Sequence, residues 1–532
     1  ANQYAISARG FNNTFANKLL VLIDGRTVYT PLFSGTFWEA QDVLLEDIER
    51  IEVISGPGAV LWGAKAVNGA INIITRSAAD TQGALATLGA GTRDKQLGMR
   101  YGGQAAGANY RVYAKAVRRE HTSMADGTPI RDMGEQVQFG FRADWARPAG
   151  ERFTLQGDGY GGEVQGQGRE YEGLNLLGRW TRDLGEGAQL KQQAYYDLTA
   201  RRHSGVFKER LHTFDYELQH ALKPMGRHRL LWGLGLRHHE DQIENSTSVV
   251  FAPAERSLNR NAIFVQDEIG LRKDLELTLG AKVDWNSYTG LEFLPSARLG
   301  WQVADAHFLW TALSRTVRAP SRVDRELTSP GAPPIVPPLL GGPNFVSEVA
   351  KVFELGYRGQ PLASLSYSVT LFHHDYEHLR TTTLTPAGTF ITNEREGDVQ
   401  GVEAWGSWRP ADWWRLSAGV VRLNQDLVAR PGSVAPAGEG NDPRGWYKLR
   451  AAFDLGSSWD LDLMLRHYEE LPNPAVPSYT ALDARLGWYL SRGIELSLLL
   501  QNLTDRRHAE FGPAANRVEF ERAAFFKVRV SL

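Results

Sequence analysis

The sequence predicts an all-β transmembrane protein: an antiparallel β-barrel of about twenty-two strands over residues 81–532, preceded by a small α+β unit at residues 1–80. Three observations predict this fold. Long segments alternate apolar and polar residues, short and long connections alternate between those segments, and tryptophans gather beside the short connections.

The bulk composition is compatible with such a barrel. The chain has 532 residues, a formal net charge of −2 and no cysteine. This composition gives no electrostatic argument for nucleic acid, and it excludes disulfides and thiolate metal sites. The mean hydropathy of −0.34 suits a water-soluble protein, but a membrane barrel also has a low mean because lipid-facing and lumen-facing residues alternate. No apolar run reaches the roughly 18 residues that a spanning helix needs.

Residues 1–80 predict a small mixed unit. The run LLVLIDGRTVY predicts a strand, a turn at Asp24–Gly25 and a second strand, and VLLEDIERIEVI predicts a helical turn that leads into a strand. AINIIT, residues 70–75, predicts another strand. Between these strands lie four small residues that permit tight turns and close approach of the backbone, namely Gly56, Gly58, Gly63 and Gly69. A phosphate-binding loop is the alternative for this stretch, but GxxxxGK[ST] does not occur.

The barrel prediction depends on period-two alternation. In WDLDLMLRHY, residues 459–468, every second residue from Trp459 to Leu465 is apolar. Segments of this kind exceed the 5 to 6 residues typical of soluble sandwiches and approach the length that crosses a bilayer at a tilt. The predicted strands are 83–90, 94–103, 108–120, 134–147, 151–163, 169–181, 188–202, 209–222, 227–240, 259–270, 274–287, 291–303, 306–315, 348–359, 363–377, 391–409, 414–425, 444–455, 459–470, 477–489, 493–502 and 517–532.

Connections and aromatic residues give the barrel its orientation. Short turns such as RPAGE, LRKD and LGSS fall at every second connection, and longer segments such as 241–258 and 316–347 lie between them. Outer-membrane barrels combine short periplasmic turns with long extracellular loops. The tryptophans near the short turns predict an interfacial girdle, and they are Trp145, Trp180, Trp301, Trp408, Trp413, Trp459 and Trp488.

Motifs along nearly the whole chain resemble those of TonB-dependent outer-membrane receptors. The N-terminal part resembles their plug domain through ARGF (Ala8–Phe11), LLVLIDGRTVY and IERIEVISGPGAVLWGAKAVNGAINIIT. The barrel part resembles the family at FVQDEI (Phe264–Ile269), SRTVRAPS (Ser314–Ser321), PNFVSE (Pro343–Glu348), FELGYR (Phe353–Arg358), QGVEAW (Gln400–Trp405) and QNLTDRRH (Gln501–His508).

The resemblance implies a twenty-two-stranded barrel with residues 1–80 as a plug in its lumen. It also implies active import of a scarce, bulky solute, powered through TonB, ExbB and ExbD. The leading hypothesis is a ferric siderophore or a related metal chelate, and cobalamin or another nutrient is the alternative. We expect a monomer in the bacterial outer membrane, in contact with lipid and lipopolysaccharide. In the family, a signal peptide, a TonB-binding segment and about the first third of the plug precede the matching part, so no TonB-contacting residue can be named.

The resemblance also suggests a latch between plug and barrel. Arg9 matches a family plug arginine, and Glu354 and Glu403 match family barrel glutamates. A second family arginine commonly precedes the Gly-Pro pair, but this chain has Ser55 there, which puts the full charge quartet in doubt. A buried guanidinium still needs carboxylates, so we expect Arg9 to pair with the two glutamates. Ordinary hydrated lumen charges are the alternative.

Candidate substrate-binding residues lie on the plug and on the wall. The segment TPLFSGTFWEA is a candidate plug apex, and its apolar faces come from Tyr29, Phe33, Phe37 and Trp38, which could equally anchor the plug fold. A predicted basic rim at the extracellular strand ends would attract anionic chelates. Lipopolysaccharide contact or loop solvation is the alternative for this rim, which consists of Arg118, Arg119, His121, Arg201, Arg202, His203, Arg237, His238 and His239.

Other functions are less compatible with the sequence. We expect no metal site or cofactor of the protein's own, because His373 and His374 are neighbours on one predicted strand and point to opposite faces. Any iron or cobalt would belong to the transported ligand. No nucleophile–base constellation suggests an enzyme. A signalling receptor of the same architecture remains possible, whereas a passive porin would have no plug.

Overall fold

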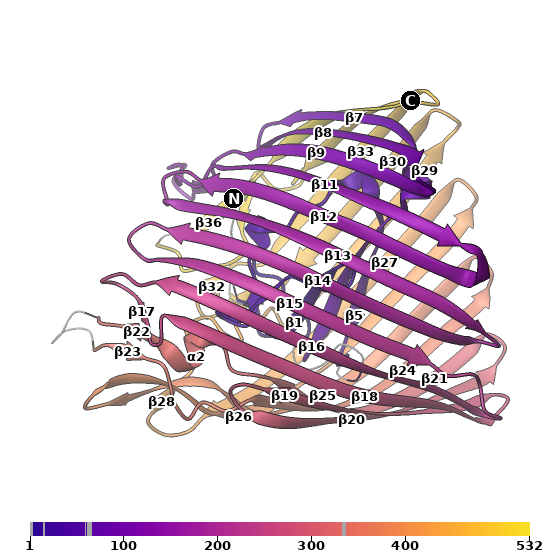
Figure 1. Cartoon of the computed structure of the whole chain (residues 1–532). Coiled ribbons are helices and arrows are strands. Elements are labelled where there is room, and N and C mark those ends of the chain that lie inside the picture. Colours follow the sequence, from indigo (N-terminus) through magenta and orange to yellow (C-terminus); the bar gives the residue numbers. More distant parts are fainter. Residues whose placement is uncertain (1–3, 14–15, 59, 61–65, 332–336, 516) are drawn as a thin grey trace.

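The computed structural model describes residues 4–13, 16–58, 60, 66–331, 337–515 and 517–532. A closed barrel of tilted antiparallel strands surrounds the N-terminal part of the chain, which is the indigo segment inside the barrel in Figure 1. The barrel closes where its last strand, β37 (Ala523–Ser531), pairs with its first, β7 (Gly83–Gly91). Closure pairs every strand on both sides, as a membrane barrel requires.

Each of the twenty-two predicted strands has a counterpart among the described residues. Beside β7 and β37, the barrel strands are β8 (Asp94–Ala105), β9 (Ala108–Arg119), β11 (Gly134–Arg147), β12 (Glu151–Val164), β13 (Arg169–Gly185), β14 (Ala188–His203), β15 (Phe207–Ala221), β16 (His228–Glu244), β18 (Glu255–Arg272), β19 (Leu275–Asn286), β20 (Gly290–Ala304), β21 (His307–Arg318), β24 (Glu348–Leu362), β25 (Leu365–Thr385), β26 (Gly388–Ala411), β27 (Trp414–Ala429), β29 (Gly445–Leu455), β30 (Trp459–Tyr468), β33 (Tyr479–Ser491) and β34 (Ile494–Gln501). Boundaries differ most for β25, which continues to Thr385 in a polar hairpin with β26 that hydropathy alternation did not reveal, and for β37, which begins at Ala523 and not at residue 517.

The two ends of the barrel differ as predicted. Two residues, 106–107, join β8 to β9, whereas residues 319–347 separate β21 from β24. Near the short turns, the rings of Trp459 and Trp488 stack on the outer surface with centroids 5.1 Å apart. Five of the seven girdle tryptophans are exposed at this end: Trp301, Trp408, Trp413, Trp459 and Trp488. Among the described residues, no helix has both the length and the hydropathy needed to cross a membrane.

The plug is built on a four-stranded mixed sheet in the order β2-β1-β6-β5. Its strands are β1 (Leu19–Ile23), β2 (Arg26–Thr27), β5 (Ile48–Ser55) and β6 (Gly69–Thr75), and β1 runs parallel to β6. The predicted turn holds Asp24 and Gly25 at φ of 51° and 83°. The predicted helical turn is the 3₁₀ helix η2 (Leu45–Asp47), and the other short plug elements are β3 (Tyr29–Thr30), β4 (Gly35–Thr36), η1 (Trp38–Ala40) and η3 (Ala78–Thr81). Every residue of β1 is buried, which explains its uninterrupted apolar sequence.

Short elements fill the long-loop end. They are β10 (Ser123–Met124), β17 (Val250–Phe251), α2 (Arg322–Glu326), β22 (Leu327–Ser329), β23 (Leu339–Leu340), β28 (Ser433–Val434), β31 (Leu471–Pro472), β32 (Ala475–Val476), β35 (Arg507–Ala509) and β36 (Val518–Glu521), while η4 (Pro148–Gly150) forms a short turn at the other end. The helix α2 begins with a capping box in which Ser321 and Asp324 satisfy each other's backbone N–H groups. We call residues 319–329, which carry α2 over the plug, the strap.

Candidate functional site

Arg9 joins the plug to the barrel wall. Its guanidinium donates to Glu354 Oε1 at 2.8 Å and to both carboxylate oxygens of Glu403 at 3.1 and 3.3 Å. The Arg9 side chain is only 1% exposed. Burial lowers the pKa of Arg9, but the carboxylates of Glu403 and Glu354 outweigh that effect and raise the pKa above its ordinary value. The structure therefore brings together the three residues of the suggested latch, which we call the clamp.

Other side chains and the backbone of the plug pack closely against the clamp. The Arg9 guanidinium lies 4.5 Å from the ring centre of Phe372 and 3.2 Å from His374 Nε2. Gly56 adopts a φ of +89°, and a Cβ built on it would lie 2.4 Å from Glu354 Oε1. Glycine is thus needed here both for its backbone conformation and for the space that the clamp occupies. Of the other glycines singled out in the sequence, Gly63 lies outside the described residues.

Further buried ion pairs surround the plug, and the sequence did not single them out. Lys18 Nζ lies 2.6 Å from Glu348, and Arg26 lies 2.7 Å from Asp197. Burial lowers the pKa of Arg26, but the nearby Asp197 carboxylate raises it overall. Other pairs between plug and wall are Lys18–Glu439, Glu39–Arg201, Asp42–Lys115, Glu46–Lys527, and Asp47 with Arg100 and Arg111. Charged plug residues thus meet opposite charges around much of the wall.

The candidate apex residues are covered on the extracellular side. The N–H groups of Arg322 and Val323 in the strap donate to Pro31 O and Leu32 O at 3.0 and 2.8 Å. Phe33 packs in an apolar cluster with Leu32, Ile243 and Phe251, on which Phe37 and Val323 also pack.

The other two apex candidates are also held within the protein. Trp38 packs against the plug core beside Val21 and Ile23. Burial raises the pKa of Tyr29 to about 12. In this closed arrangement these aromatic side chains serve packing, and a role in binding substrate stays a prediction.

The nine basic residues do not form one rim. Arg201 and Arg202 are neighbours on β14 and point to opposite faces. Arg201 lies 3.4 Å from the ring centre of Phe37 inside the lumen, and Arg202 is exposed on the outer surface, where it pairs with Glu170 at 3.4 Å. Arg118 likewise pairs with Glu135 on the outer surface. His121 accepts hydrogen bonds from the backbone N–H groups of Asp132 and Met133 in the following loop. Arg119 and His203 stand at the ends of β9 and β14.

The placement of residues 237–239 at a strand end is wrong. β16 continues to Glu244, because its polar tip pairs with β15 and β18 beyond the apolar part. Arg237 pairs with Asp215 at 2.6 Å inside the lumen, and His239 contacts Thr213 at 2.9 Å. His238 points outward to Asn259.

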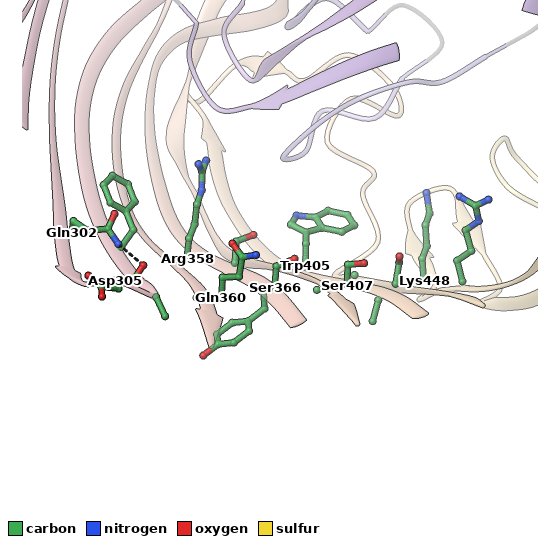
Figure 2. Close-up of a pocket in the computed structure, with 18 of the residues that line it drawn as sticks. Gln302, Asp305, Arg358, Gln360, Ser366, Trp405, Ser407 and Lys448 are labelled. Carbon is green, nitrogen blue, oxygen red and sulfur yellow. Dashed lines mark hydrogen bonds between the residues drawn. The ribbon is translucent and has the colours of Figure 1, made fainter. Parts of the chain in front are cut away.

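Two adjoining cavities lie inside the barrel, one between the plug and the wall and one lined by residues of the wall alone. The larger, of about 1410 Å³, extends from Arg9 and Asn12 on the plug to Phe511 and Phe520 in an extracellular loop. A smaller one, of about 830 Å³, lies toward the short-turn end; Figure 2 shows Arg358, Trp405 and Lys448 pointing from the wall into the interior. Trp405 and Lys448 line both cavities, so the two adjoin. In the described part of the chain, no group of three or more histidine and acidic side chains is arranged to hold a metal ion.

The cavity was not foreseen from the sequence. Its walls combine plug residues with strands and loops several hundred residues away, and no local pattern links them. The alternation along β26 could have identified Trp405 as lumen-facing, since it lies two residues from Glu403.

Comparison with protein families gives two matches that together span most of the chain. Residues 1–70 match the TonB-dependent receptor plug domain, and residues 73–503 match the β-barrel of TonB-dependent receptor-like proteins.

Relatives and solved structures agree with this result. An iron-regulated outer membrane virulence protein of Vibrio cholerae is 25% identical, with 95% of this chain and 84% of that protein covered. The vitamin B12 transporter of Vibrio vulnificus is 21% identical, with 95% and 82% covered. The ferric enterobactin receptor of Pseudomonas aeruginosa, solved as a variant, superposes with a TM-score of 0.83 at 16% identity over 98% of this chain and 91% of that one. A siderophore receptor of Acinetobacter baumannii gives a TM-score of 0.82 at 16% identity, covering 98% and 91%.

Proposed function

The chain belongs to the family of TonB-dependent outer-membrane receptors, and on that premise we propose that it imports a ferric siderophore or a related metal chelate. The proposal takes residues 1–80 as the movable plug and residues 81–532 as the barrel. TonB, with ExbB and ExbD, would supply the work that displaces the plug. An iron-regulated relative and the similarity to siderophore receptors support iron as the cargo.

The buried ion pairs between plug and wall support the proposal that displacing the plug requires energy. Arg9 and Lys18 are buried and paired with wall glutamates that are themselves nearly inaccessible to water. Separating such pairs inside the lumen leaves buried charges without partners, at a cost of several kcal/mol for each pair. A bulky solute therefore cannot displace the plug by diffusion alone, and an external source of work is required.

Uptake measurements test this proposal. The protein would be expressed in a bacterium that lacks its own iron-chelate and cobalamin receptors, and growth would be followed on a panel of ferric chelates and on cobalamin. We expect rescue by a ferric chelate. Uptake should stop when the tonB gene is deleted, while binding of the chelate to cells continues.

The same panel separates the alternatives. Rescue by cobalamin alone would favour the second candidate, to which the vitamin B12 transporter of Vibrio vulnificus gives support. Uptake that persists without TonB would refute energy coupling. Binding without uptake in cells with an intact TonB system would point to a signalling receptor.

A further inference from the structure

A continuous series of aromatic rings runs along the larger cavity. It begins at Trp405 on β26 and passes to Trp446 on β29 and Tyr468 at the end of β30, with ring centroids 5.4 and 6.0 Å apart. Tyr479 follows at 5.3 Å, His508 at 4.0 Å and Phe520 at 6.3 Å. We call these six residues the aromatic ladder. It connects the extracellular loop 502–522 with the region of the clamp.

The ladder faces the lumen and not the lipid. Trp405 shares its face of β26 with Glu403, which reaches Arg9 in the plug. Trp446 is paired in register with Tyr468, and Tyr468 with Tyr479, so these side chains follow one another on the same surface. All the ladder residues except His508 line the larger cavity. The lumen of a membrane barrel is normally polar, so a continuous aromatic surface inside it is not explained by the membrane.

Packing of the plug does not explain the ladder either. The buried apolar clusters that hold the plug contain none of these six residues. Trp405 is 42% exposed although it lies inside the barrel. Three of the contacts, from Trp446 to His508, are stacked with interplanar angles between 12° and 29°. Parallel rings with an open side can accept further flat rings by offset stacking.

The charges beside the ladder restrict the ligand further. Lys448 Nζ lies 5.2 Å from the ring centre of Trp446, and both Lys448 and Arg517 line the cavity. Five acids also line it, and each already has a partner: Glu403 pairs with Arg9, Glu469 pairs with Arg422, and Glu510 accepts a hydrogen bond from the Tyr479 hydroxyl of the ladder. Asp442 accepts hydrogen bonds from the Asn12 N–H and Gln425, and Asp132 accepts them from Thr122. A ring that carries anionic oxygens could therefore stack on the ladder and place its charge near Lys448 and Arg517.

From this arrangement we infer that the aromatic ladder binds the planar aromatic groups of the transported ligand, so that the ligand is a chelate built on anionic aromatic rings. The inference rests on the proposed function and assigns the chemical class of its substrate. The cavity volume of about 1410 Å³ accommodates a bulky chelate.

Binding to the purified receptor tests the inference, with two iron complexes as probes. Ferric tris-catecholate is anionic and aromatic, and ferric citrate is anionic without rings. Equilibrium dialysis with radioactive iron gives the Kd of each. We expect the unaltered protein to bind tris-catecholate at least about tenfold more tightly than citrate. Equal binding of the two, or binding of neither, would overturn the inference, and this comparison does not depend on the folding of any variant.

Variants locate the binding surface. Changing Tyr468→Leu and Tyr479→Leu together should raise the Kd for tris-catecholate about tenfold or more and leave that for citrate unchanged. Tyr447→Leu is the matched control, because Tyr447 is adjacent to Trp446 but exposed on the outer surface, where it stacks on His467. Heat-modifiable migration in gels verifies folding. If the double variant binds like the unaltered protein, or if the control loses as much affinity, the ladder is not the binding surface.

Failure of this inference can be told apart from failure of the proposed function. Dialysis uses no membrane energy, so a preference for tris-catecholate that depends on the ladder would stand even if uptake proved independent of TonB. TonB-dependent uptake of a chelate without aromatic rings would leave the proposed function intact and refute the ligand class.

Discussion

Replacing Arg9 by alanine removes one cation and leaves two carboxylates facing each other in a buried site. Arg9 makes a 2.8 Å contact with Glu354 and a bidentate contact with Glu403, and its side chain is 1% exposed, so water does not screen these pairs. Removing one partner of a buried pair costs about 3–5 kcal/mol. Since about 1.4 kcal/mol corresponds to a factor of ten, the plug should open locally about 100- to 5000-fold more often.

Native-state hydrogen exchange measures this opening. The amides of β1 and β6 pair inside the plug sheet and report on it directly. The matched control is Arg50→Ala, because Arg50 lies on the same plug, also pairs with two glutamates and is exposed. Exposed pairs contribute little to stability, so exchange in this control should change less than about twofold. If Arg9→Ala exchanges at the rate of the unaltered protein or of the control, the clamp does not hold the plug.

Three other predictions concern Gly56 beside the clamp, Arg322 in the strap and Asp442 in an extracellular loop. Gly56→Ala should lower the free energy of local plug opening by about 1–3 kcal/mol, because Gly56 has a φ of +89° and a Cβ there would collide with Glu354. Gly107 is the control: it has a φ of +72°, but no atom of the described residues lies within 4 Å of the position that a Cβ would take, so Gly107→Ala should cost less. Hydrogen exchange measures both effects. Arg322→Ala leaves Asp241 and Glu326 without their buried partner, so trypsin should cleave the strap at Arg325 at least about 100-fold faster. The Arg315 side chain is partly exposed, so Arg315→Ala should have little effect on this cleavage. Burial raises the pKa of Asp442, which accepts a hydrogen bond from the Asn12 N–H, so the folded protein holds this proton more tightly than the unfolded chain does. The stabilisation provided by the protonated Asp442 is fully present below the ordinary aspartate pKa of about 4, and it is lost as the pH rises through the higher pKa of Asp442 in the folded protein. Thermal unfolding of the Asp442→Asn variant should lack this pH dependence.

Some residues of the site could be predicted from the sequence, and others could not. Arg9, Glu354 and Glu403 could be named because each lies in a motif that resembles the family, and the structure places them in contact. Lys18, Arg26 and Asp42 lie in the same plug, but their partners are 330, 171 and 73 residues away, and no local pattern connects them. For Arg237 to His239, apolar alternation ended before the strand did, so the predicted strand end was too early.

The sequence by itself determined the barrel, its number of strands, the difference between its two ends and a small N-terminal α+β unit, whereas the role of that unit as a plug was implied by the resemblance to the family. Those features depend on period-two alternation, turn residues and tryptophans, which are local properties of the chain. Only the tertiary structure decided which charges pair the plug with the wall, that the strap covers its apex, and that aromatic rings from four barrel strands and one loop form one surface. Closing the barrel and filling its lumen bring together side chains that are far apart in the sequence. No local pattern predicts these contacts, because the register of the whole barrel sets them and neighbouring residues do not.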